Sequence, residues 1–415
     1  LHPLAVYAVG YLVQRTVLMA TLFGLLAVST YFDGLVTRLK SYFVFSAFFY
    51  LLAVFSKEQA LAVGLLAIVI TPLVVTVSFK AWRRFLVLGV VLILAALWVF
   101  SKRWVAPGQT YEPFALGYMT LLNISTEDVW GLSVLTQASL FFKYLLLMFM
   151  PYHGWMSIDM RVPFAESFYQ VKYLFGVAAL AGYAGLAFWL LLRGARRSLI
   201  GFALLAPLLL YIVEFWGVRI QEPFVLYRAY LWLPFLCFLL PAMTSNVPNR
   251  VFWPVLVIVA AVFMVSSNNR LVSFSSNLAI WDDAAFKLTQ PMASGAPRIY
   301  MQRGLAHYNL GNFQAALEDY DQALKGWPEY NQIHWNRALV NARMGNLKEA
   351  LQDANKYKEL SPGDPGYFEL TGELYKYVKN FEMALHNYKA GCMAGRVAAC
   401  YGYAEIERMQ MQRKN

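Results

Sequence analysis

Long apolar runs separated by short charged turns make up the first 270 residues of the chain. A helix needs roughly 20 apolar residues to cross the hydrocarbon layer of a bilayer. We therefore expect residues 1–270 to form an all-α, polytopic transmembrane bundle with about eight to ten membrane segments. Eight runs approach the required length, at 16–32, 42–55, 60–79, 85–101, 172–192, 199–217, 226–243 and 251–267.

A ninth apolar run, at 134–150, follows the least regular part of this region. The segment 102–133 is too long and too polar for a tight turn, and it contains Pro107-Gly108 and Glu127-Asp128. Two interpretations stay open. Either 134–150 is re-entrant, interfacial or paired with a weak crossing near 113–125, or it crosses the membrane once by itself.

Basic residues in the short turns predict the orientation, because cytoplasmic loops are enriched in Lys and Arg. The 56–59 turn, the longer loops and the C-terminal part then lie outside, provided that 102–150 crosses an even number of times. A single crossing would instead place the C-terminal part in the cytoplasm, and we favour the first arrangement. The basic turns contain Arg38 and Lys40; Lys80, Arg83 and Arg84; Arg193, Arg196 and Arg197; and Arg250.

The C-terminal part has an internal period of 34 residues, which is typical of stacked helix pairs. Small residues stand where paired helices cross, at Gly304, Ala338 and Gly372. This pattern is similar to the tetratricopeptide repeat (TPR) and predicts a C-terminal α-solenoid. We divide it into a linker at 271–296, repeats at 297–330, 331–364 and 365–398 within 297–396, and a capping helix and tail at 397–415. The periodic positions are Gly311, Phe313, Ala316, Tyr320 and Pro328, then Gly345, Leu347, Ala350, Ala354 and Pro362, then Lys379, Phe381, Ala384, Tyr388 and Arg396.

Composition supports the membrane class, since 59% of the residues are hydrophobic and only 14% are charged. The net charge of +11 does not indicate nucleic-acid binding. Residues 297–415 carry 15 Lys or Arg against 13 Asp or Glu, so the basic excess belongs to the apolar region. Cys237 lies in an apolar run, whereas Cys392 and Cys400 can pair in an oxidising compartment; we favour two buried thiols for the latter.

Several ionisable residues fall at the predicted outer ends of membrane segments, where such groups default to a functional hypothesis. Arg15 begins the first run, Lys57 and Glu58 occupy a turn, and Arg219, Glu222 and Arg228 surround the start of 226–243. The alternative is that the cations reach the lipid headgroups without a specific ligand. His153 and Glu214 are weaker candidates for a site, and a structural role for each stays open.

Five local motifs occur in a fixed order along the chain: His2-Pro3 with Arg15, Ser56-Lys57-Glu58, Tyr144 with Pro151 and Asp159, Tyr227-Arg228-Ala229-Tyr230-Leu231, and Trp281-Asp282. With the attached repeats, this order resembles the TPR-bearing membrane O-glycosyltransferases, bacterial relatives of the transmembrane and tetratricopeptide-repeat O-mannosyltransferases. The resemblance covers nearly the whole chain and implies the multi-span fold called GT-C.

The resemblance implies transfer of a sugar from a polyprenyl-phosphate donor to a protein or glycan outside the cytoplasm. Cations would hold the phosphate, and a carboxylate would act as a base or as a ligand of a divalent metal. Glu58 is either that carboxylate or an ion-pair partner of Lys57. The candidate residues are Arg15, Lys57, Glu58, Asp159, Arg228 and Tyr230.

Members of this family place an acidic motif before the His-Pro motif, whereas this chain begins at that motif. We therefore expect the catalytic residues upstream of Leu1 if the protein is an enzyme. The other class is a non-catalytic membrane scaffold that docks a protein partner through its repeats. In either case we predict a bacterial inner-membrane protein with a periplasmic TPR domain and no nucleic-acid partner.

Overall fold

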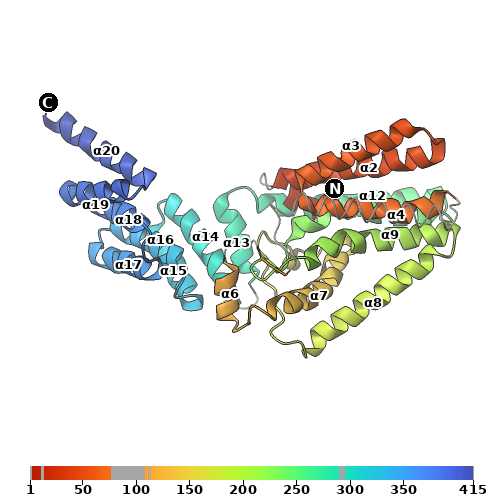
Figure 1. Cartoon of the computed structure of the whole chain (residues 1–415), viewed down its shortest axis with the longest axis horizontal. Helices are drawn as coiled ribbons and strands as arrows, with labels where there is room; N and C mark the ends of the chain where they lie inside the picture. Colours follow the sequence, from red (N-terminus) through yellow and green to blue (C-terminus); the bar gives the residue numbers. More distant parts are fainter. Residues whose placement is uncertain are drawn as a thin grey trace. The chain divides into compact units, whose positions relative to one another are not determined.

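The computed structural model describes residues 2–10, 14–75, 108–110, 112, 114–288 and 295–414. The described residues form helices and connecting segments, with no β-strand among them. They divide into two compact units, 1–275 and 276–415 (Figure 1). The predicted span 85–101 lies outside the described residues.

Five helices of the N-terminal unit are long and apolar enough, by length and composition, to cross a membrane. They coincide with four predicted spans and with the ninth apolar run. Two further predicted spans, 42–55 and 60–79, correspond to the shorter helices α3 and α4. The five long segments are α2 (Arg15–Thr37), α7 (Val129–Phe149), α8 (Val171–Leu191), Arg196–Phe215, which includes α9 (Ala195–Tyr211) and η4 (Ile212–Phe215), and α12 (Asn249–Val272); α3 is Lys40–Ser56 and α4 is Val63–Val74.

The predicted span 226–243 is broken into short helices instead of forming one long helix. Pro234 stands in the first turn of α10, and Pro241 lies within α11. Proline has no amide hydrogen and obstructs the preceding turn, so a continuous helix is disfavoured here. The short elements are η5 (Leu226–Leu231), α10 (Leu233–Leu236) and α11 (Leu239–Thr244); elsewhere in the unit lie α1 (Ala5–Val9), η2 (Glu58–Ala62), α6 (Ala115–Leu121) and η3 (His153–Trp155).

Aromatic side chains form the centre of the N-terminal core. Trp232 directly follows η5. The centroid of its ring lies 5.0 Å from that of Tyr211, 5.3 Å from that of Tyr144 and 5.8 Å from that of Phe141. All four side chains are buried. Edge-to-face arrangements of this kind add to the free energy gained by burying apolar surface. This cluster joins α7, α9 and the broken segment after residue 225.

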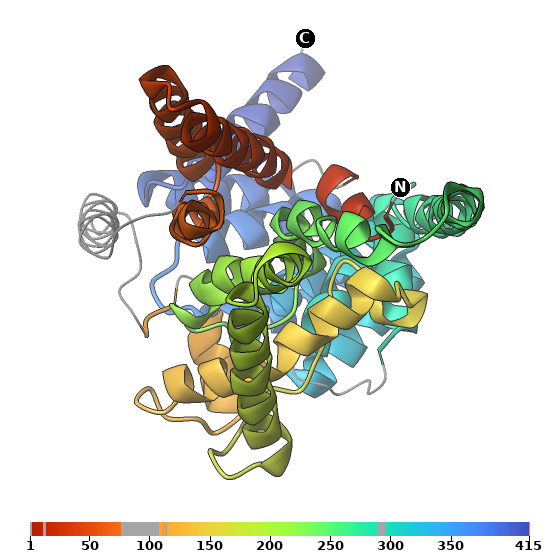
Figure 2. The same ribbon diagram turned by 90° about the vertical axis from the view of Figure 1, so that its right-hand side faces the viewer.

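The N-terminal unit has two ends, which are defined here by their turns. The Lys57 end contains the α3–α4 connection, and the Arg193 end contains the α8–α9 connection (Figure 1). The α2–α3 and α8–α9 hairpins each pack as a pair (Figure 2). At the Arg193 end, Arg196 Nη2 donates to the carbonyl oxygen of Met243 at 3.3 Å, which places the end of α11 there.

Each end of α7 is held by a remote segment. Trp130 Nε1 donates to the Phe215 carbonyl at 3.0 Å, and the Met148 carbonyl lies 2.9 Å from His2 Nε2. His2 precedes α1, which packs on η5. The start of α7 is therefore joined to the end of η4, and its end is joined to the residues before α1.

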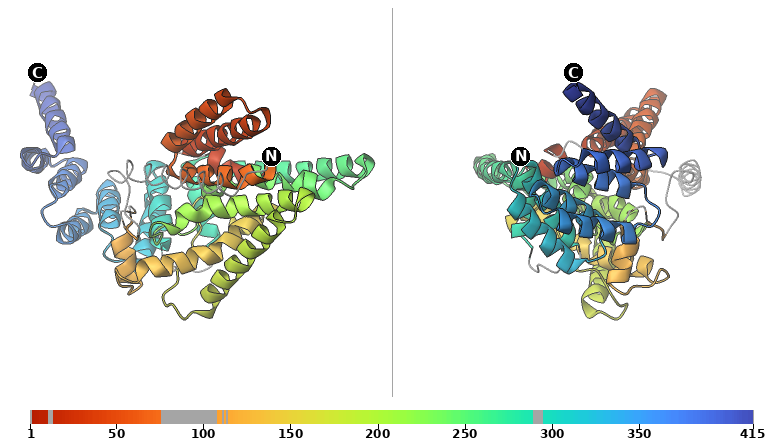
Figure 3. Two further views of the ribbon diagram at one scale, coloured as in Figure 1. Left: turned by 45° about the vertical axis from the view of Figure 1, so that its right-hand side comes forward. Right: turned by 90° about the vertical axis from the view of Figure 1, so that its left-hand side faces the viewer.

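The C-terminal unit contains three antiparallel helix pairs followed by a further helix, as predicted (Figure 3). A Cβ atom at Gly304 would lie 2.8 Å from the Tyr320 ring, and one at Gly372 would lie 2.6 Å from the Tyr388 ring. The absence of a side chain at these glycines lets the paired helices approach. The pairs are α14 (Ala296–Asn309) with α15 (Phe313–Gly326), α16 (Asn331–Arg343) with α17 (Leu347–Leu360), and α18 (Gly366–Tyr377) with α19 (Phe381–Met393); α20 (Val397–Lys414) follows.

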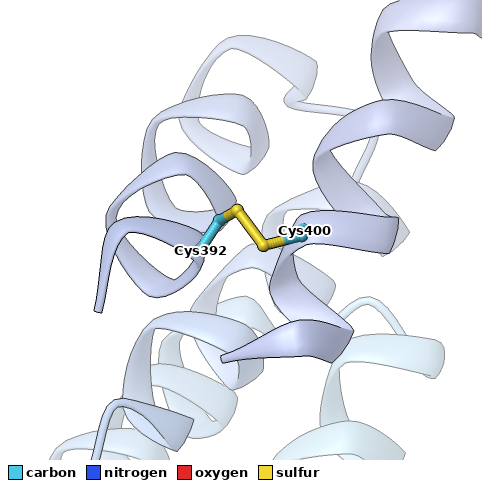
Figure 4. The surroundings of a disulfide bond; sticks show 2 residues. All are labelled: Cys392 and Cys400. Carbon is cyan, nitrogen blue, oxygen red and sulfur yellow. A yellow bond between two sulfur atoms is a disulfide. The ribbon is translucent and has the colours of Figure 1, made fainter. Parts of the chain in front are cut away.

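Each helix pair is joined by the same turn, although the third repeat has lost its glycine. Gly311 and Gly345 have φ angles of 80° and 86°, and Lys379 adopts a φ of 62° at the equivalent position. Only glycine populates this left-handed region without a steric cost. The preference for two buried thiols at the end of the solenoid is wrong, because Cys392 and Cys400 form a disulfide that joins α19 to α20 (Figure 4).

The segment 271–296, which we predicted to be a linker, contains α13 (Asn277–Phe286). The Ser276 hydroxyl accepts a hydrogen bond from the Ala279 amide at 3.1 Å and so caps the start of this helix. α13 belongs to the C-terminal unit, and Asp282 lies 3.4 Å from Arg303 of α14. It therefore covers the first face of the solenoid, as α20 covers the last.

Candidate functional site

Three segments meet at the Lys57 end: the turn formed by Lys57 and η2, the end of α9 with η4, and the segment from Trp216 into η5. Each begins or ends beside a long apolar helix, so its polar side chains collect at one end of the unit. Glu214 lies at the centre of this group and is only 3% exposed. Isolated burial of a carboxylate is costly, so its partners decide what the site can do.

Three side chains surround the Glu214 carboxylate. Gln59 Nε2 donates to Oε1 at 2.7 Å, while Arg219 Nε and Arg228 Nη1 lie 3.1 and 3.4 Å from Oε2. Arg228 also donates to the Glu222 carbonyl at 2.9 Å. The buried carboxylate is therefore matched by two guanidinium groups and one amide donor, a cluster that we call the Glu214 cluster: Gln59, Glu214, Arg219 and Arg228.

The backbone between Trp216 and η5 is held by side chains from distant segments. Gln137 Nε2 donates to the Pro223 carbonyl at 2.8 Å, and the Tyr144 hydroxyl donates to the Val225 carbonyl at 3.0 Å. The Ser133 hydroxyl accepts from the Arg219 amide at 3.0 Å. These three residues lie on one face of α7, spaced at roughly helical intervals. One helix therefore fixes the segment that carries both arginines.

Glu112 holds the same segment from a second side. Its carboxylate accepts from the Gln221 amide at 2.6 Å and from the Glu222 amide at 3.2 Å. Burial raises the pKa of Glu112 to about 7, because desolvation of the charged form outweighs these hydrogen bonds and the attraction of Arg228. Glu112 is thus a buried carboxyl group that changes protonation near neutral pH.

Lys57 and Glu58 lie at the exposed side of the Glu214 cluster, next to Gln59 in the chain. The Lys57 ammonium is 3.8 Å from the Glu58 carboxylate. Lys57 is 24% exposed, whereas the side chains of Arg219 and Arg228 are 4% and 5% exposed. Among these three cations, Lys57 is therefore the one that an incoming anion meets first. Glu58 is near enough to act electrostatically on Arg219.

The other sequence-predicted candidates occupy different environments. Asp159 forms a buried ion pair with Arg161, which also donates to the Gln221 carbonyl at 2.8 Å. Tyr230 is half-buried on η5, and Arg15 is exposed at the start of α2. The structure thus brings Lys57, Glu58 and Arg228 to one region. Asp159 is joined to that region through Arg161.

His153 does not contact the Glu214 cluster in the described structure; it forms a hydrogen bond with Ser266 of α12. His2 contacts α7 through the Met148 carbonyl and α12 through the Phe263 ring, 4.7 Å away. Both histidines therefore tie α12 to its neighbours. These contacts favour the structural interpretation of His153.

The arrangement favours anion binding over metal binding. Among the described residues, no group of three or more His, Cys, Asp or Glu side chains is placed to hold a metal ion. The Glu214 carboxylate faces two guanidinium groups, which would repel a divalent cation. An exposed ammonium backed by these groups instead suits a phosphate or carboxylate.

Sequence reasoning missed Gln59, Glu112 and Lys143. Gln59 is uncharged, and Glu112 lies in an irregular segment, so neither stood out from the chain. Lys143 lies in an apolar run, with its ammonium 4.6 Å from the centroid of Phe224. A lysine within an apolar run signals that a partner for its charge lies nearby in the fold. Here that partner is the Phe224 ring, through a cation–π contact.

Comparison with known proteins identifies the repeats alone. The sequence profile of the family described as tetratricopeptide repeat matches residues 301–365. The Hsp70-Hsp90 organizing protein of Triticum aestivum is 27% identical over 90 residues, 22% of this chain and 16% of that protein. A serine/threonine-protein phosphatase T of Aspergillus oryzae is 29% identical over 104 residues, 25% of this chain and 22% of that protein.

These matches have a limited extent. The chain spans less than a quarter of the length of either relative. The repeats, together with the similarity to these relatives, indicate binding of protein partners.

Proposed function

We propose that the protein is an integral membrane glycosyltransferase-like protein that transfers a sugar from a polyprenyl-phosphate donor to a protein or glycan. The observation that carries this proposal is the buried Glu214 cluster beneath the exposed Lys57–Glu58 turn. Ionisable groups at the ends of apolar helices are costly and are retained where they meet a ligand. A lipid phosphate at the membrane boundary is an anion that Lys57 would meet.

The distribution of charge supports a membrane orientation for this unit. Arg38, Lys40, Arg196 and Arg250 lie in turns that follow or precede helices at the Arg193 end, opposite the Glu214 cluster. The positive-inside rule then places the Arg193 end in the cytoplasm and the Lys57 end outside. This orientation requires that 102–150 crosses the membrane an even number of times.

The proposed mechanism divides the site into two layers. The Lys57 ammonium holds the leaving phosphate, and the Glu58 carboxylate takes the proton from the acceptor hydroxyl. Arg228 and Arg219 act through Glu214 by holding the segment between Trp216 and η5 in place. A divalent metal would require carboxylates outside the described residues.

The C-terminal repeats are proposed to present the acceptor protein on the outer side of a bacterial inner membrane. Disulfides persist in oxidising compartments such as the periplasm, and the Cys392–Cys400 bond agrees with that location. Stacked TPR helices form a surface that binds peptides or proteins. Three repeats give a short surface, which suits one acceptor segment.

The proposal is tested by transfer of a labelled sugar from a polyprenyl-phosphate donor in membranes holding the longest gene product that contains this chain. Lys57→Ala should lower transfer by roughly 10- to 100-fold if the phosphate contact strengthens in the transition state by about 1.5–3 kcal/mol. Lys57→Arg should retain part of the activity because it keeps the charge. Arg250→Ala, a cation at the opposite end, is the matched control and should leave transfer unchanged.

A second function, a non-catalytic scaffold, is favoured by a different observation. Glu214, Arg219 and Arg228 are engaged with one another, while the repeats form a complete solenoid with both ends covered by helices. In that case the protein would dock a partner through its repeats. Absence of transfer by wild-type protein across a panel of donors, together with recovery of a partner that binds residues 276–415, would favour the scaffold over the transferase.

A further inference from the structure

An apolar cavity of about 820 Å³ opens at the Arg193 end of the N-terminal unit, away from the Glu214 cluster. Its walls come from α2, the end of α4, the α8–α9 connection and α10, with Phe32, Val74, Phe202 and Phe235 among the lining residues. Among the described residues, those that line it carry no charged side chain. The volume lies within the range of small-molecule sites, and the lining suits a hydrocarbon chain.

The polar groups in the wall leave the cavity lining predominantly apolar. The Ser198 hydroxyl donates to the Leu191 carbonyl at 2.6 Å, so it is satisfied within the turn. The cavity therefore offers contact with apolar surface and few hydrogen bonds. A sugar or a nucleotide would lose its hydration without replacement here, whereas an acyl chain would not.

Three arginines adjoin lining residues of this cavity in the chain. Arg193, Arg196 and Arg197 flank the lining residues Gly194 and Ser198, and all three side chains are exposed. The segment 189–200 contains no acidic residue that would neutralise them. The apolar cavity is thus lined by residues that are next to three positively charged residues in the chain.

The contacts of these arginines place their charged groups near the protein surface. The Arg193 guanidinium lies 4.4 Å from the centroid of the Trp189 ring. Arg196 donates to the Met243 carbonyl with one nitrogen and so keeps other N–H groups for a ligand. A guanidinium can hold a phosphate by two parallel hydrogen bonds, and Trp is common at the level of lipid headgroups.

We propose that this cavity binds an anionic phospholipid, with an acyl chain between α2, α4 and α9 and the headgroup phosphate on Arg193, Arg196 and Arg197. Basic pockets between membrane helices on the cytoplasmic side suit anionic headgroups. The inference rests on the membrane placement in the proposed function, and it concerns the opposite end from the sugar donor. The occupant is a lipid of the bilayer and takes no part in transfer.

Native mass spectrometry of the full chain tests this inference, after exchange into nanodiscs of phosphatidylcholine with or without phosphatidylglycerol. We expect wild-type protein to retain phosphatidylglycerol over phosphatidylcholine. In the variant Arg193→Gln/Arg196→Gln/Arg197→Gln, the ratio of retained phosphatidylglycerol to phosphatidylcholine should fall by roughly tenfold. Ser29→Leu narrows the cavity and should lower retention of both lipids. Arg38→Gln/Lys40→Gln, two cations at the same end, is the matched control and should keep the preference.

Equal retention of both lipids by wild-type protein would overturn the inference, as would an unchanged preference in the triple variant. A dimer that carries no lipid would overturn it as well, because a second copy would then cover the cavity. Two separate measurements distinguish these failures from failure of the proposed function. Absence of lipid preference in wild-type protein that still transfers sugar refutes only the lipid site, whereas extraction of the chain from membranes by carbonate refutes the membrane placement.

Discussion

Gln59 Nε2 donates a hydrogen bond of 2.7 Å to Oε1 of Glu214, and 155 positions separate the two residues in the chain. Both side chains are buried, at 5% and 3% exposure. This contact joins the turn after α3 to the end of α9. It also satisfies the carboxylate oxygen that is not facing the two arginines.

Gln59→Leu should lower the free energy of unfolding by about 1.5–3 kcal/mol, because a buried carboxylate loses a hydrogen-bond donor. Unfolding of the detergent-solubilised protein by sodium dodecyl sulfate measures this difference. Lys57→Leu is the control, since its exposed ion pair contributes only about 0–1 kcal/mol. Equal stability of the Gln59 and Lys57 variants would contradict a stabilising role for the contact.

Glu112 should make stability depend on pH below neutrality. Its pKa is about 7 in the folded protein against the ordinary glutamate value of 4.5, so between these values the folded state binds more protons than the unfolded state. Stability should therefore fall as pH rises from about 4.5 to 7, by up to roughly 3 kcal/mol, and then level off.

Glu112→Gln tests this pH dependence, because glutamine has nearly the same shape and does not titrate. At low pH the variant should resemble wild type, because the protonated carboxyl group likewise presents one carbonyl oxygen to the amides of Gln221 and Glu222. The decisive quantity is the slope of the unfolding free energy against pH, which should become flatter. A slope unchanged from wild type would assign the pH dependence to another group.

Arg337 and Asp353 should stabilise the second repeat as a unit. Arg337 Nε and Nη2 donate to the two carboxylate oxygens at 2.9 and 2.7 Å, and Asp353 is 4% exposed. A double-mutant cycle with Arg337→Ala and Asp353→Ala should give a coupling free energy of about 1–2 kcal/mol. The coupling free energy is measured from hydrogen exchange of residues 331–360 in the full chain of each variant.

The third repeat supplies the matched control for this cycle. Thr371 and Asn387 occupy the equivalent positions 34 residues later, and their side chains share a neutral hydrogen bond of 3.0 Å. Neutral hydrogen bonds are weaker than charge-assisted ones. The coupling measured with Thr371→Ala and Asn387→Ala should therefore be the smaller of the two, and the reverse order would refute the assignment.

The Cys392–Cys400 disulfide should hold α20 against α19. The bond joins residues 8 positions apart in the chain. Because it restricts the unfolded chain, it is expected to raise the free energy of unfolding by about 2.5 kcal/mol. Cys392→Ser should therefore speed hydrogen exchange in 397–414, and Cys237→Ser should not. Maleimide should label Cys237 alone before reduction and all three cysteines afterwards; labelling of three cysteines without reductant would show that the bond is absent.

The repeats were predictable from the chain because their contacts recur at a fixed sequence distance. Each helix pair repeats a small residue at the Gly304 position and a turn at the Gly311 position, and the first and third pairs have an aromatic residue at the Tyr320 position. The conformation of Lys379 was not evident, since a lysine carries no local preference for a positive φ. There the stacking of neighbouring helices over-determines the backbone.

The apolar periodicity was informative where a helix runs without interruption. It indicated α2, α8, α9 and α12, but it did not reveal that 226–243 is broken. Prolines at 234 and 241 were visible, yet hydropathy alone counts proline as compatible with a long run. The partners that decide the local backbone, such as Tyr144 at Val225, lie far away in the chain.

By itself, the sequence determined the helical class, the repeat period and the presence of Lys57, Glu58 and Arg228 at helix boundaries, because composition and periodicity are local properties. Only the tertiary structure decided which of these groups meet. It placed Gln59 and Arg228 on Glu214, paired Asp159 with Arg161, and joined Cys392 to Cys400. The physical reason is that burial, distance and charge matching arise when remote segments pack together, and no local pattern encodes that packing.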